Sequence, residues 1–223
     1  MERYNVVEIK EDVTSRNNLF AAEIKRKLAD KKVFYLNVMA SPGSGKTTLL
    51  AELIRRLKGD YKIGVIEADI DSSVDAETIS KTGVRTLQMH TAGACHITCQ
   101  MSYEALCALG YEDLDVVFLE NVGNLVCPAE FDTGATENLV LLSTPEGDDK
   151  PKKYPLMFQV ANVVAVTKTD VADVFDFSTE RAEKNVRSRN GTAPVFFLSV
   201  VAQEGVDDLE RYLRQKINKV KNG

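Results

Sequence analysis

Short apolar runs alternate with amphipathic stretches along most of this chain. The runs that predict strands cover residues 33–39, 63–67, 85–89, 116–120, 139–142, 163–166 and 195–198. Helical periodicity is found at residues 16–29, 46–57, 102–109, 179–189 and 206–220. Strands that alternate with helices are typical of an α/β fold, with a mostly parallel central sheet and helices on both faces.

One longer polar stretch, residues 144–155, interrupts this alternation. Its prolines, glycine and mixed charges predict a loop rather than a domain boundary, because strand patterning resumes directly after it. A chain of 223 residues is long enough to bury a substantial core in one domain. We therefore expect a single domain over residues 1–223, with residues 1–31 as an N-terminal helical lead-in.

The most specific motif lies between the first predicted strand and the next predicted helix. It consists of Ser41, Pro42, Gly43, Ser44, Gly45, Lys46, Thr47 and Thr48. A strand, a glycine-rich loop and a helix in this order are the context of a P-loop, whose backbone N–H groups bind phosphates. Lys46 would reach the β- and γ-phosphates and Thr47 would hold Mg²⁺, although Ala40 replaces the usual first glycine. The motif predicts binding of a nucleoside triphosphate.

A second motif follows a later strand, at the sheet edge where ligands of open α/β folds bind. Lys168 and Asp170 resemble the N-K-x-D motif of GTPases, in which the carboxylate accepts hydrogen bonds from guanine N1–H and N2–H₂. Thr167 stands in place of the asparagine. Downstream, Ser199 and Val200 lie in a stretch similar to the loop that backs the base. We therefore expect the domain to bind GTP and GDP rather than ATP.

Acidic residues follow two other strands. Asp69 is open to the γ-phosphate and is a candidate to bind Mg²⁺ or to orient the attacking water, with Asp75 as second choice. Some of these acids could instead cap the next helix. Glu120 is a Walker-B-like acid, and Gly123 has the spacing of the D-x-x-G switch, whose glycine N–H meets the γ-phosphate. We assign Lys46, Asp69 and Glu120 to catalysis.

Cysteine and histidine suggest a second kind of site. Cys95 and His96 are adjacent in a glycine-containing loop ahead of a helical stretch, and Cys127 precedes a proline. Thiolate and imidazole ligands select Zn²⁺, Ni²⁺ or Cu, and a helix start favours the thiolate. Free cysteines are also common as small buried hydrophobes, so the spacing alone leaves both interpretations open. We assign Cys99 and Cys107 to the core, with Cys99 as an alternative accessory ligand.

The composition of the chain excludes some classes of binding partner. The net charge of −5 argues against nucleic acid or an anionic membrane as the main partner. No apolar run approaches the roughly 20 residues that span a bilayer, and residues 1–8 show no signal-peptide pattern. We therefore expect a cytoplasmic protein. In that reducing compartment the four cysteines are not expected to form disulfides.

Together these motifs resemble the HypB GTPases, which help deliver nickel to nickel-iron hydrogenase. The resemblance extends from about Asn18 onward and is strongest in five segments. These are residues 41–50, the acidic segment with Asp69, Ser72, Asp75 and Ala76, residues 93–96 (Gly-Ala-Cys-His), residues 120–128 (Glu-Asn-Val-Gly-Asn-Leu-Val-Cys-Pro) and residues 144–155.

The resemblance implies a slow GTPase that acts as a switch, a homodimer that assembles on GTP binding, and other hydrogenase maturation proteins as partners. It also implies that Cys95, His96 and Cys127 form a Zn²⁺ or Ni²⁺ site at or near the subunit interface. Because Cys127 lies just past Gly123, residues 120–127 give a short route from the γ-phosphate to the metal.

Three alternatives can be distinguished. Urease-type nickel GTPases carry Cys-Pro-His, whereas Cys127 and Pro128 are followed here by Ala129. A P-loop kinase for small molecules would show no guanine selectivity, whereas Asp170 favours guanine. A nucleotide-sensing scaffold would bind GTP with negligible hydrolysis.

Overall fold

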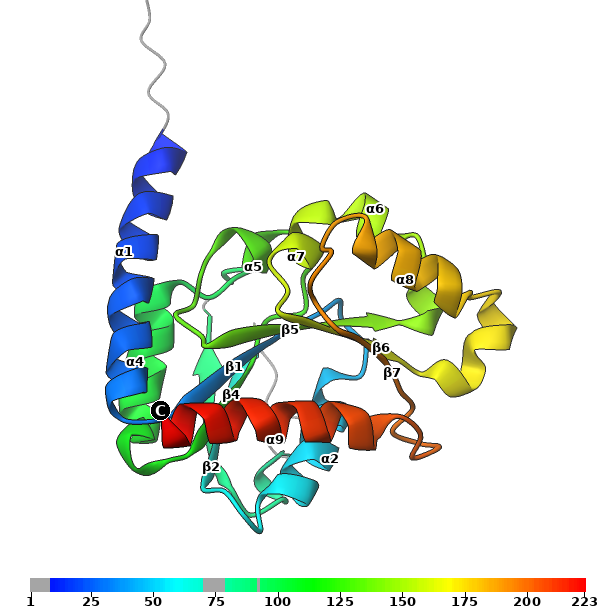
Figure 1. Ribbon diagram of the computed structural model, residues 1–223. Helices are drawn as coiled ribbons and strands as arrows, with labels where there is room; N and C mark the ends of the chain where they lie inside the picture. Colours follow the sequence, from blue (N-terminus) through cyan, green and yellow to red (C-terminus); the bar gives the residue numbers. More distant parts are fainter. Residues whose placement is uncertain (1–8, 70–78, 92) are drawn as a thin grey trace, which may run out of the picture.

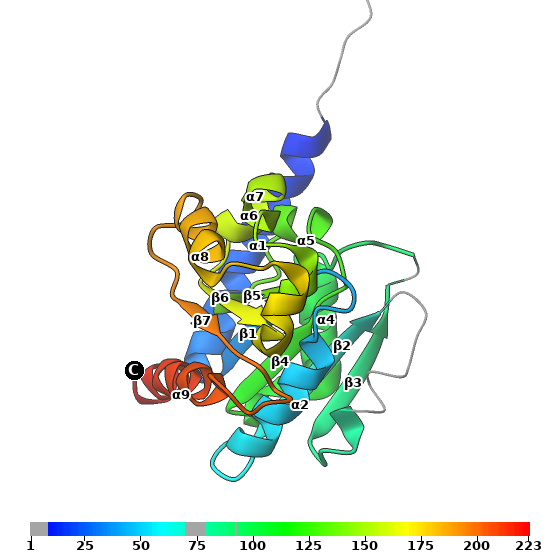
Figure 2. The same ribbon diagram turned by 90° about the vertical axis from the view of Figure 1, so that its right-hand side faces the viewer.

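The computed structural model is built around a seven-stranded sheet. It describes residues 9–69, 79–91 and 93–223, and within these ranges it describes the side chains of all residues from 15 onward except Asp69. All strand pairs in the sheet are parallel, and the strand order is β3-β2-β4-β1-β5-β6-β7. The strands are β1 (Phe34–Met39), β2 (Ile63–Asp69), β3 (Arg85–His90), β4 (Val116–Glu120), β5 (Glu137–Ser143), β6 (Val163–Thr167) and β7 (Val195–Phe197). Figure 2 shows β3 at one edge and β7 toward the other.

Helices cover both faces of the sheet (Figure 1). α2 (Lys46–Leu57) and α9 (Val206–Asn222) pack on one face. α1 (Ile9–Asp30), α4 (Cys99–Leu109), α7 (Pro155–Gln159) and α8 (Thr179–Arg187) pack on the other. Two further short helices are α5 (Cys127–Glu130) and α6 (Lys150–Lys153), and the 3₁₀ segments are η1 (Tyr111–Asp113), η2 (Thr144–Glu146) and η3 (Thr169–Phe175).

The central strand β1 explains why the chain reads as continuous apolar runs. Leu36 and Val38 face the α2 and α9 side, whereas Tyr35 and Met39 face the opposite helices. Successive side chains of a strand point to opposite faces, so a strand covered on both sides is apolar at nearly every position. Asn37 is the polar exception in β1 and is also buried.

The predicted α/β fold with its parallel sheet is confirmed, and α2 and β4 have the predicted bounds. Residues 144–155 were expected to be a loop, and this was wrong, because η2, α6 and the start of α7 lie there. Each of these segments carries proline in its first turn, where the missing N–H costs no helical hydrogen bond. The single-domain interpretation stays a prediction. Along the described ranges, no helix is both long enough and apolar enough to cross a membrane.

Candidate nucleotide and metal sites

The P-loop joins β1 to α2 at the carboxyl edge of the sheet. Gly43 and Gly45 have φ angles of 73° and 94°, in the left-handed region that a Cβ would strain. Lys46 is the first residue of α2 and only 8% exposed, and its Nζ donates to the Ser41 carbonyl oxygen at 3.4 Å. The fully buried Ser44 hydroxyl meets no hydrogen-bond partner among the described residues. A loop of this shape fits a phosphate group at the positive N-terminal end of α2.

Two buried carboxylates lie on β4 and β2, the two strands next to β1 on one side of the sheet. Glu120 closes β4, is 4% exposed and accepts a 2.8 Å hydrogen bond from the Thr47 hydroxyl at Oε1. Glu67 on β2 is its register partner and is 3% exposed. Glu67 carries no distinguishing signal in the sequence, since its place beside Glu120 depends on the pairing of two strands far apart in the chain. Together these acids line the edge at which Mg²⁺ is expected.

Asp69 ends β2 opposite His90 on β3. The side chain of Asp69 lies outside the described residues, as do Ser72, Asp75 and Ala76, so the predicted Mg²⁺ role of Asp69 stays a prediction.

The backbone after β4 lies directly against the P-loop. A Cβ built on Gly123 would lie 3.0 Å from Cγ of Pro42 and 3.1 Å from its Cα and N. Real Cβ atoms are rarely found so close to other atoms, so a larger residue at this position would require a shift of a few tenths of an ångström. The contact links residues 120–127, which we call the connecting segment, to the predicted phosphate site.

A row of three asparagines, two buried and one half-buried, holds the start of the connecting segment. Asn121 donates to Asn37 Oδ1 at 3.0 Å, and Asn37 donates to Asn138 Oδ1 at 3.0 Å. Asn138 in turn donates to the carbonyl oxygen of Val160 at 3.1 Å. Asn121 Oδ1 also accepts from the N–H of Val122 at 2.9 Å. This row crosses β4, β1 and β5 and was not found from the sequence, because only strand register brings the three amides together.

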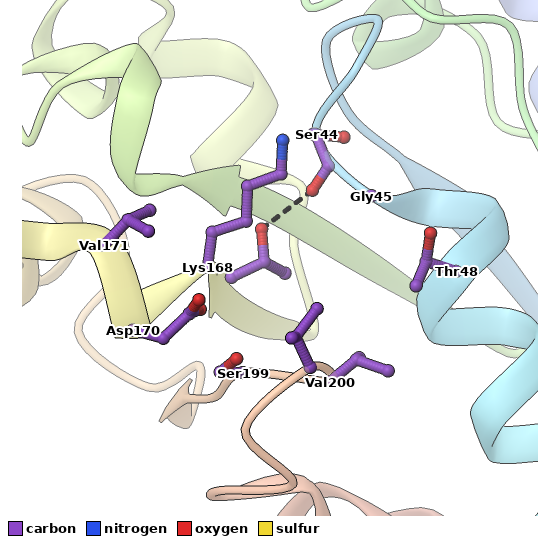
Figure 3. Close-up of a pocket in the computed structure, with 10 residues that line it drawn as sticks. Ser44, Gly45, Thr48, Lys168, Asp170, Val171, Ser199 and Val200 are labelled. Carbon is purple, nitrogen blue, oxygen red and sulfur yellow. Dashed lines mark hydrogen bonds between the residues drawn. The ribbon is translucent and has the colours of Figure 1, made fainter.

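The candidate base pocket lies between the P-loop, the end of β6 and the loop after β7 (Figure 3). Its volume is about 230 Å³. The lining residues are Ser44, Gly45, Thr48, Thr167, Lys168, Asp170, Val171, Ser199, Val200 and Val201. In Figure 3 the Asp170 carboxylate points into the space that the Lys168 stem borders. The structure thus brings the predicted base-recognition residues together with three P-loop residues, Ser44, Gly45 and Thr48, around one pocket.

Thr167 and Lys168 tie this pocket to the P-loop. The Thr167 hydroxyl donates to the Ser44 carbonyl oxygen at 2.8 Å, and Lys168 Nζ donates to the Gly43 carbonyl oxygen at 2.7 Å. Lys168 has a φ of 61°, and its own carbonyl oxygen accepts from the Thr144 hydroxyl at 2.7 Å. Threonine in place of the usual asparagine therefore still connects the base-recognition loop with the phosphate loop.

The three predicted metal ligands lie together. Cys95 and His96 belong to the loop after β3, and Cys127 is the first residue of α5. Cys95 Sγ lies 2.7 Å from Cys127 Sγ and 3.8 Å from His96 Nδ1. Ligand atoms of all three residues lie within 4.8 Å of one another, and in the described ranges no other three His, Cys, Asp or Glu side chains lie this close together. Two sulfurs and one imidazole fit a soft or borderline divalent metal such as Zn²⁺ or Ni²⁺.

The surroundings of the three predicted metal ligands change the pKa of Cys95 and His96 and hold the His96 ring in place. The hydrogen bond with Cys127 and partial burial raise the pKa of Cys95 above its usual range, opposite to the expected effect of a helix start. Burial lowers the pKa of His96, which favours the neutral imidazole that binds metals. The His96 ring stacks on Phe131 at 3.9 Å between centroids, with 15° between the planes. Phe131 had no signal in the sequence that distinguished it from a core residue.

The other two cysteines lie apart from the three predicted metal ligands. Cys99 is buried in the core as expected, and burial raises the pKa of its thiol to about 12. Cys107 was also assigned to the core, and this was wrong, because it is exposed. Leu106 and Leu109 on α4 face the sheet, and the intervening Cys107 points away from it.

A P-loop at the carboxyl edge of a parallel sheet, with a base pocket beside it, defines a P-loop nucleotide-binding protein. Residues 35–197 match the family described as CobW/HypB/UreG, nucleotide-binding domain. The chain belongs to this family, and within it to the HypB maturation factors. It is 41% identical to the hydrogenase/urease maturation factor HypB of Helicobacter hepaticus, over 94% of this chain and 88% of that protein. Identity to the hydrogenase maturation factor HypB of Escherichia coli (strain K12) is 38%, over 96% and 73% of the two chains.

Solved structures agree with this assignment. The crystal structure of HypB from Helicobacter pylori in complex with nickel superposes with a TM-score of 0.86 at 38% identity, covering 92% of this chain and 96% of that chain. HypB from Archaeoglobus fulgidus gives a TM-score of 0.85 at 29% identity, covering 91% and 99%. These similarities confirm both the P-loop NTPase fold and the resemblance to HypB.

Proposed function

We propose that this chain is a GTP-hydrolysing metallochaperone, which binds nickel and assists its insertion into nickel-iron hydrogenase during maturation of that enzyme. Its membership of the HypB maturation factors supports this function, and so does the nickel complex solved for the Helicobacter pylori relative. The observation that carries the proposal is the connecting segment. It begins at Glu120, which is bonded to Thr47 of the P-loop, and ends at Cys127, which contacts Cys95.

In this proposal the P-loop from Ser41 to Thr48 binds the phosphates of GTP, and Gly123 meets the γ-phosphate. Thr167, Lys168, Asp170, Ser199 and Val200 bind the guanine. Their common pocket beside the P-loop supports this role. Asp170 selects guanine because its carboxylate accepts two hydrogen bonds from a donor pair that adenine lacks.

Hydrolysis is assigned to Lys46, Asp69 and Glu120. Thr47 and Asp69 would hold Mg²⁺, which supplies charge neutralisation at the phosphates when it is bound. The buried position of Glu120 beside the Thr47 hydroxyl supports its part in this group. We propose a slow reaction that acts as a switch, in which GTP and water give GDP and phosphate.

Cys95, His96 and Cys127 would hold the nickel cargo, and the same donors also suit Zn²⁺. Both thiols must lose their protons for the metal to bind, so uptake releases protons into solution. We propose that the γ-phosphate of GTP orders the connecting segment and fixes the spacing of the three ligands, and that hydrolysis relaxes it and lowers metal affinity. We further propose that GTP assembles a homodimer in the cytoplasm, where it acts with other hydrogenase maturation proteins.

The test is a nickel titration of the purified chain in GDP and in a non-hydrolysable GTP analogue, with its mass in solution measured in parallel. We expect a different Ni²⁺ affinity in the two nucleotide states and a larger mass with the analogue. Equal affinities would remove the coupling from the proposal. A protein that hydrolyses GTP rapidly and binds no nickel in either state would overturn the whole assignment.

A further inference from the structure

One side chain of the N-terminal helix bridges the two loops that carry the metal ligands. Asn17 of α1 accepts a 2.9 Å hydrogen bond at Oδ1 from the backbone N–H of Cys99. Its Nδ2 donates at 2.8 Å to the carbonyl oxygen of Asp132. The Asn17 amide therefore contacts two segments that lie far from it in sequence. One segment precedes β4 in the chain and the other follows it.

Each partner of Asn17 lies just past a metal ligand. Cys99 begins α4, four residues after Cys95. Asp132 follows α5, five residues after Cys127. We call residues 95–99 the first arm and residues 127–132 the second arm. Because Asn17 is hydrogen-bonded to the last residue of each arm, it holds these two residues at a fixed distance from each other.

The helix that carries Asn17 is firmly packed beneath the first arm. Ala21 and Ile24 of α1 share one apolar cluster with Ile97 and Cys99. α1 and α4, the helix that begins at Cys99, run side by side along the same face of the sheet (Figure 1). An amide on such a support loses little further freedom when it makes its two hydrogen bonds.

α1 also holds the chain after the second arm. The backbone of Gly134 lies so close to Ile24 that a Cβ there would be 2.9 Å from Ile24 Cγ2. Lys25 pairs with the Asp132 carboxylate at 2.6 Å, but the Lys25 side chain is 45% exposed. Exposed ion pairs contribute little, so the buried contacts and the Asn17 bridge dominate.

We propose that Asn17 is a positioning residue for the metal site: it sets the spacing of Cys95 and His96 relative to Cys127 by joining the two arms. The inference rests on the proposed function of these three residues as metal ligands. Residues that orient metal ligands from outside commonly change metal affinity roughly 10- to 100-fold when they are replaced. Asn17 is thus a part of the N-terminal helix that acts on a site built by later segments of the chain.

The test is a Ni²⁺ titration of the full chain, followed by the thiolate-to-nickel charge-transfer absorbance. Asn17→Ala removes both bonds, and we expect Ni²⁺ affinity to fall roughly 10- to 100-fold with a changed charge-transfer spectrum. Asn17→Asp keeps the acceptor for the Cys99 N–H but lacks the donor to Asp132, so we expect a loss of affinity there too. Lys25→Met is the matched control on the same helix, since it removes only the exposed ion pair with Asp132.

GDP affinity is measured on every variant and reports whether the fold is intact, because none of the contacts of Asn17 described above involves the P-loop. Unchanged nickel affinity and spectrum in both Asn17 variants would overturn the positioning role. An equal loss in Lys25→Met would also overturn it, since the bridge would then not be the determining contact. Cys95→Ser and Cys127→Ser test the proposed site itself: if they bind nickel like the parent chain, the ligand assignment fails independently of Asn17.

Discussion

The Thr47 hydroxyl donates a 2.8 Å hydrogen bond to Glu120 Oε1, and this bond joins the first turn of α2 to the end of β4. Thr47 belongs to the P-loop, whereas Glu120 begins the connecting segment that ends at Cys127. The candidate nucleotide site and the candidate metal site therefore lie at the two ends of one short piece of backbone.

Replacing the Glu120 carboxylate by an amide separates its charge from its shape. Glu120→Gln can still accept the Thr47 hydrogen bond but carries no negative charge. We expect single-turnover GTP hydrolysis to fall about 100-fold, as is typical when a positioned acid–base group is removed. GDP affinity without Mg²⁺ should change little. Glu112→Gln, at an exposed residue of η1, is the control, and hydrolysis by Glu120→Gln at the parent rate would exclude a catalytic role for Glu120.

Guanine selectivity is predicted to depend on Asp170. Asp170→Asn presents only one acceptor to the guanine N1–H and N2–H₂ pair and removes the charge. Hydrogen bonds to a charged group contribute roughly 1.5–3 kcal/mol, so we expect GDP affinity to fall on the order of 10- to 100-fold. Fluorescence titration with a labelled GDP measures it. Asp173→Asn on the same η3 segment is exposed and should bind GDP normally; equal effects of both changes would contradict base recognition by Asp170.

The approach of Gly123 to Pro42 is predicted to transmit the nucleotide state. In Gly123→Ala the new Cβ would meet Pro42 at 3.0 Å, so the connecting segment or the P-loop must shift by a few tenths of an ångström. Coupling between two sites is typically 5- to 150-fold, and we expect the ratio of nickel affinities in the two nucleotide states to move toward one. Gly59→Ala adds a methyl group into open space and serves as the control. A preserved ratio in Gly123→Ala would show that this contact carries no signal.

The Cys95 and Cys127 thiols should react with each other. Their sulfurs lie 2.7 Å apart, so diamide should oxidise the pair to an intramolecular disulfide while it is itself reduced to the hydrazine. Bound Ni²⁺ or Zn²⁺ should slow the reaction by occupying both sulfurs. Alkylation and peptide mass spectrometry identify the bond, with the exposed Cys107 as an internal control for general thiol reactivity. Recovery of Cys95 and Cys127 as separately alkylated thiols would contradict the observed geometry.

Asn37 is predicted to be important for stability. Asn37→Ala leaves the buried Asn121 amide without its acceptor and Oδ1 of the half-buried Asn138 without this donor. A buried polar group that loses its partner costs about 1–3 kcal/mol, so we expect the free energy of unfolding to fall by roughly 2–4 kcal/mol. Urea unfolding measures this change. Asn218→Ala on the exposed side of α9 should cost well under 1 kcal/mol, and a similarly small effect at Asn37 would refute the prediction.

The features predicted well from the sequence are those encoded within a few residues. The strand, P-loop and helix around Lys46 are contiguous, so local propensity and glycine placement are sufficient to identify them. The adjacency of Cys95 and His96 is equally local. Their approach to Cys127 was expected only through the family resemblance, since no short spacing joins the two segments.

The features that the sequence did not reveal depend on strand register. Glu67 and Glu120 become neighbours because β2 pairs with β4, and Asn37 meets Asn121 through the β1–β4 alignment. Periodicity indicates that a strand exists but not which distant strand lies beside it. The assignment of Cys107 to the core was wrong for another reason. Adjacent residues of a helix point in different directions, so Leu106 faces the core whereas Cys107 faces solvent.

The parallel order of the sheet also constrains how the protein is made. β1 is synthesised before both of its neighbours in the sheet, β4 and β5, which come much later in the chain. The bond from Lys168 to Gly43 spans 125 residues, and contacts of such long range form slowly. A nascent chain therefore carries its phosphate loop long before it carries the rest of the pocket. The pocket is lined in part by residues 199–201, so we expect tight GTP binding only after these residues have been synthesised.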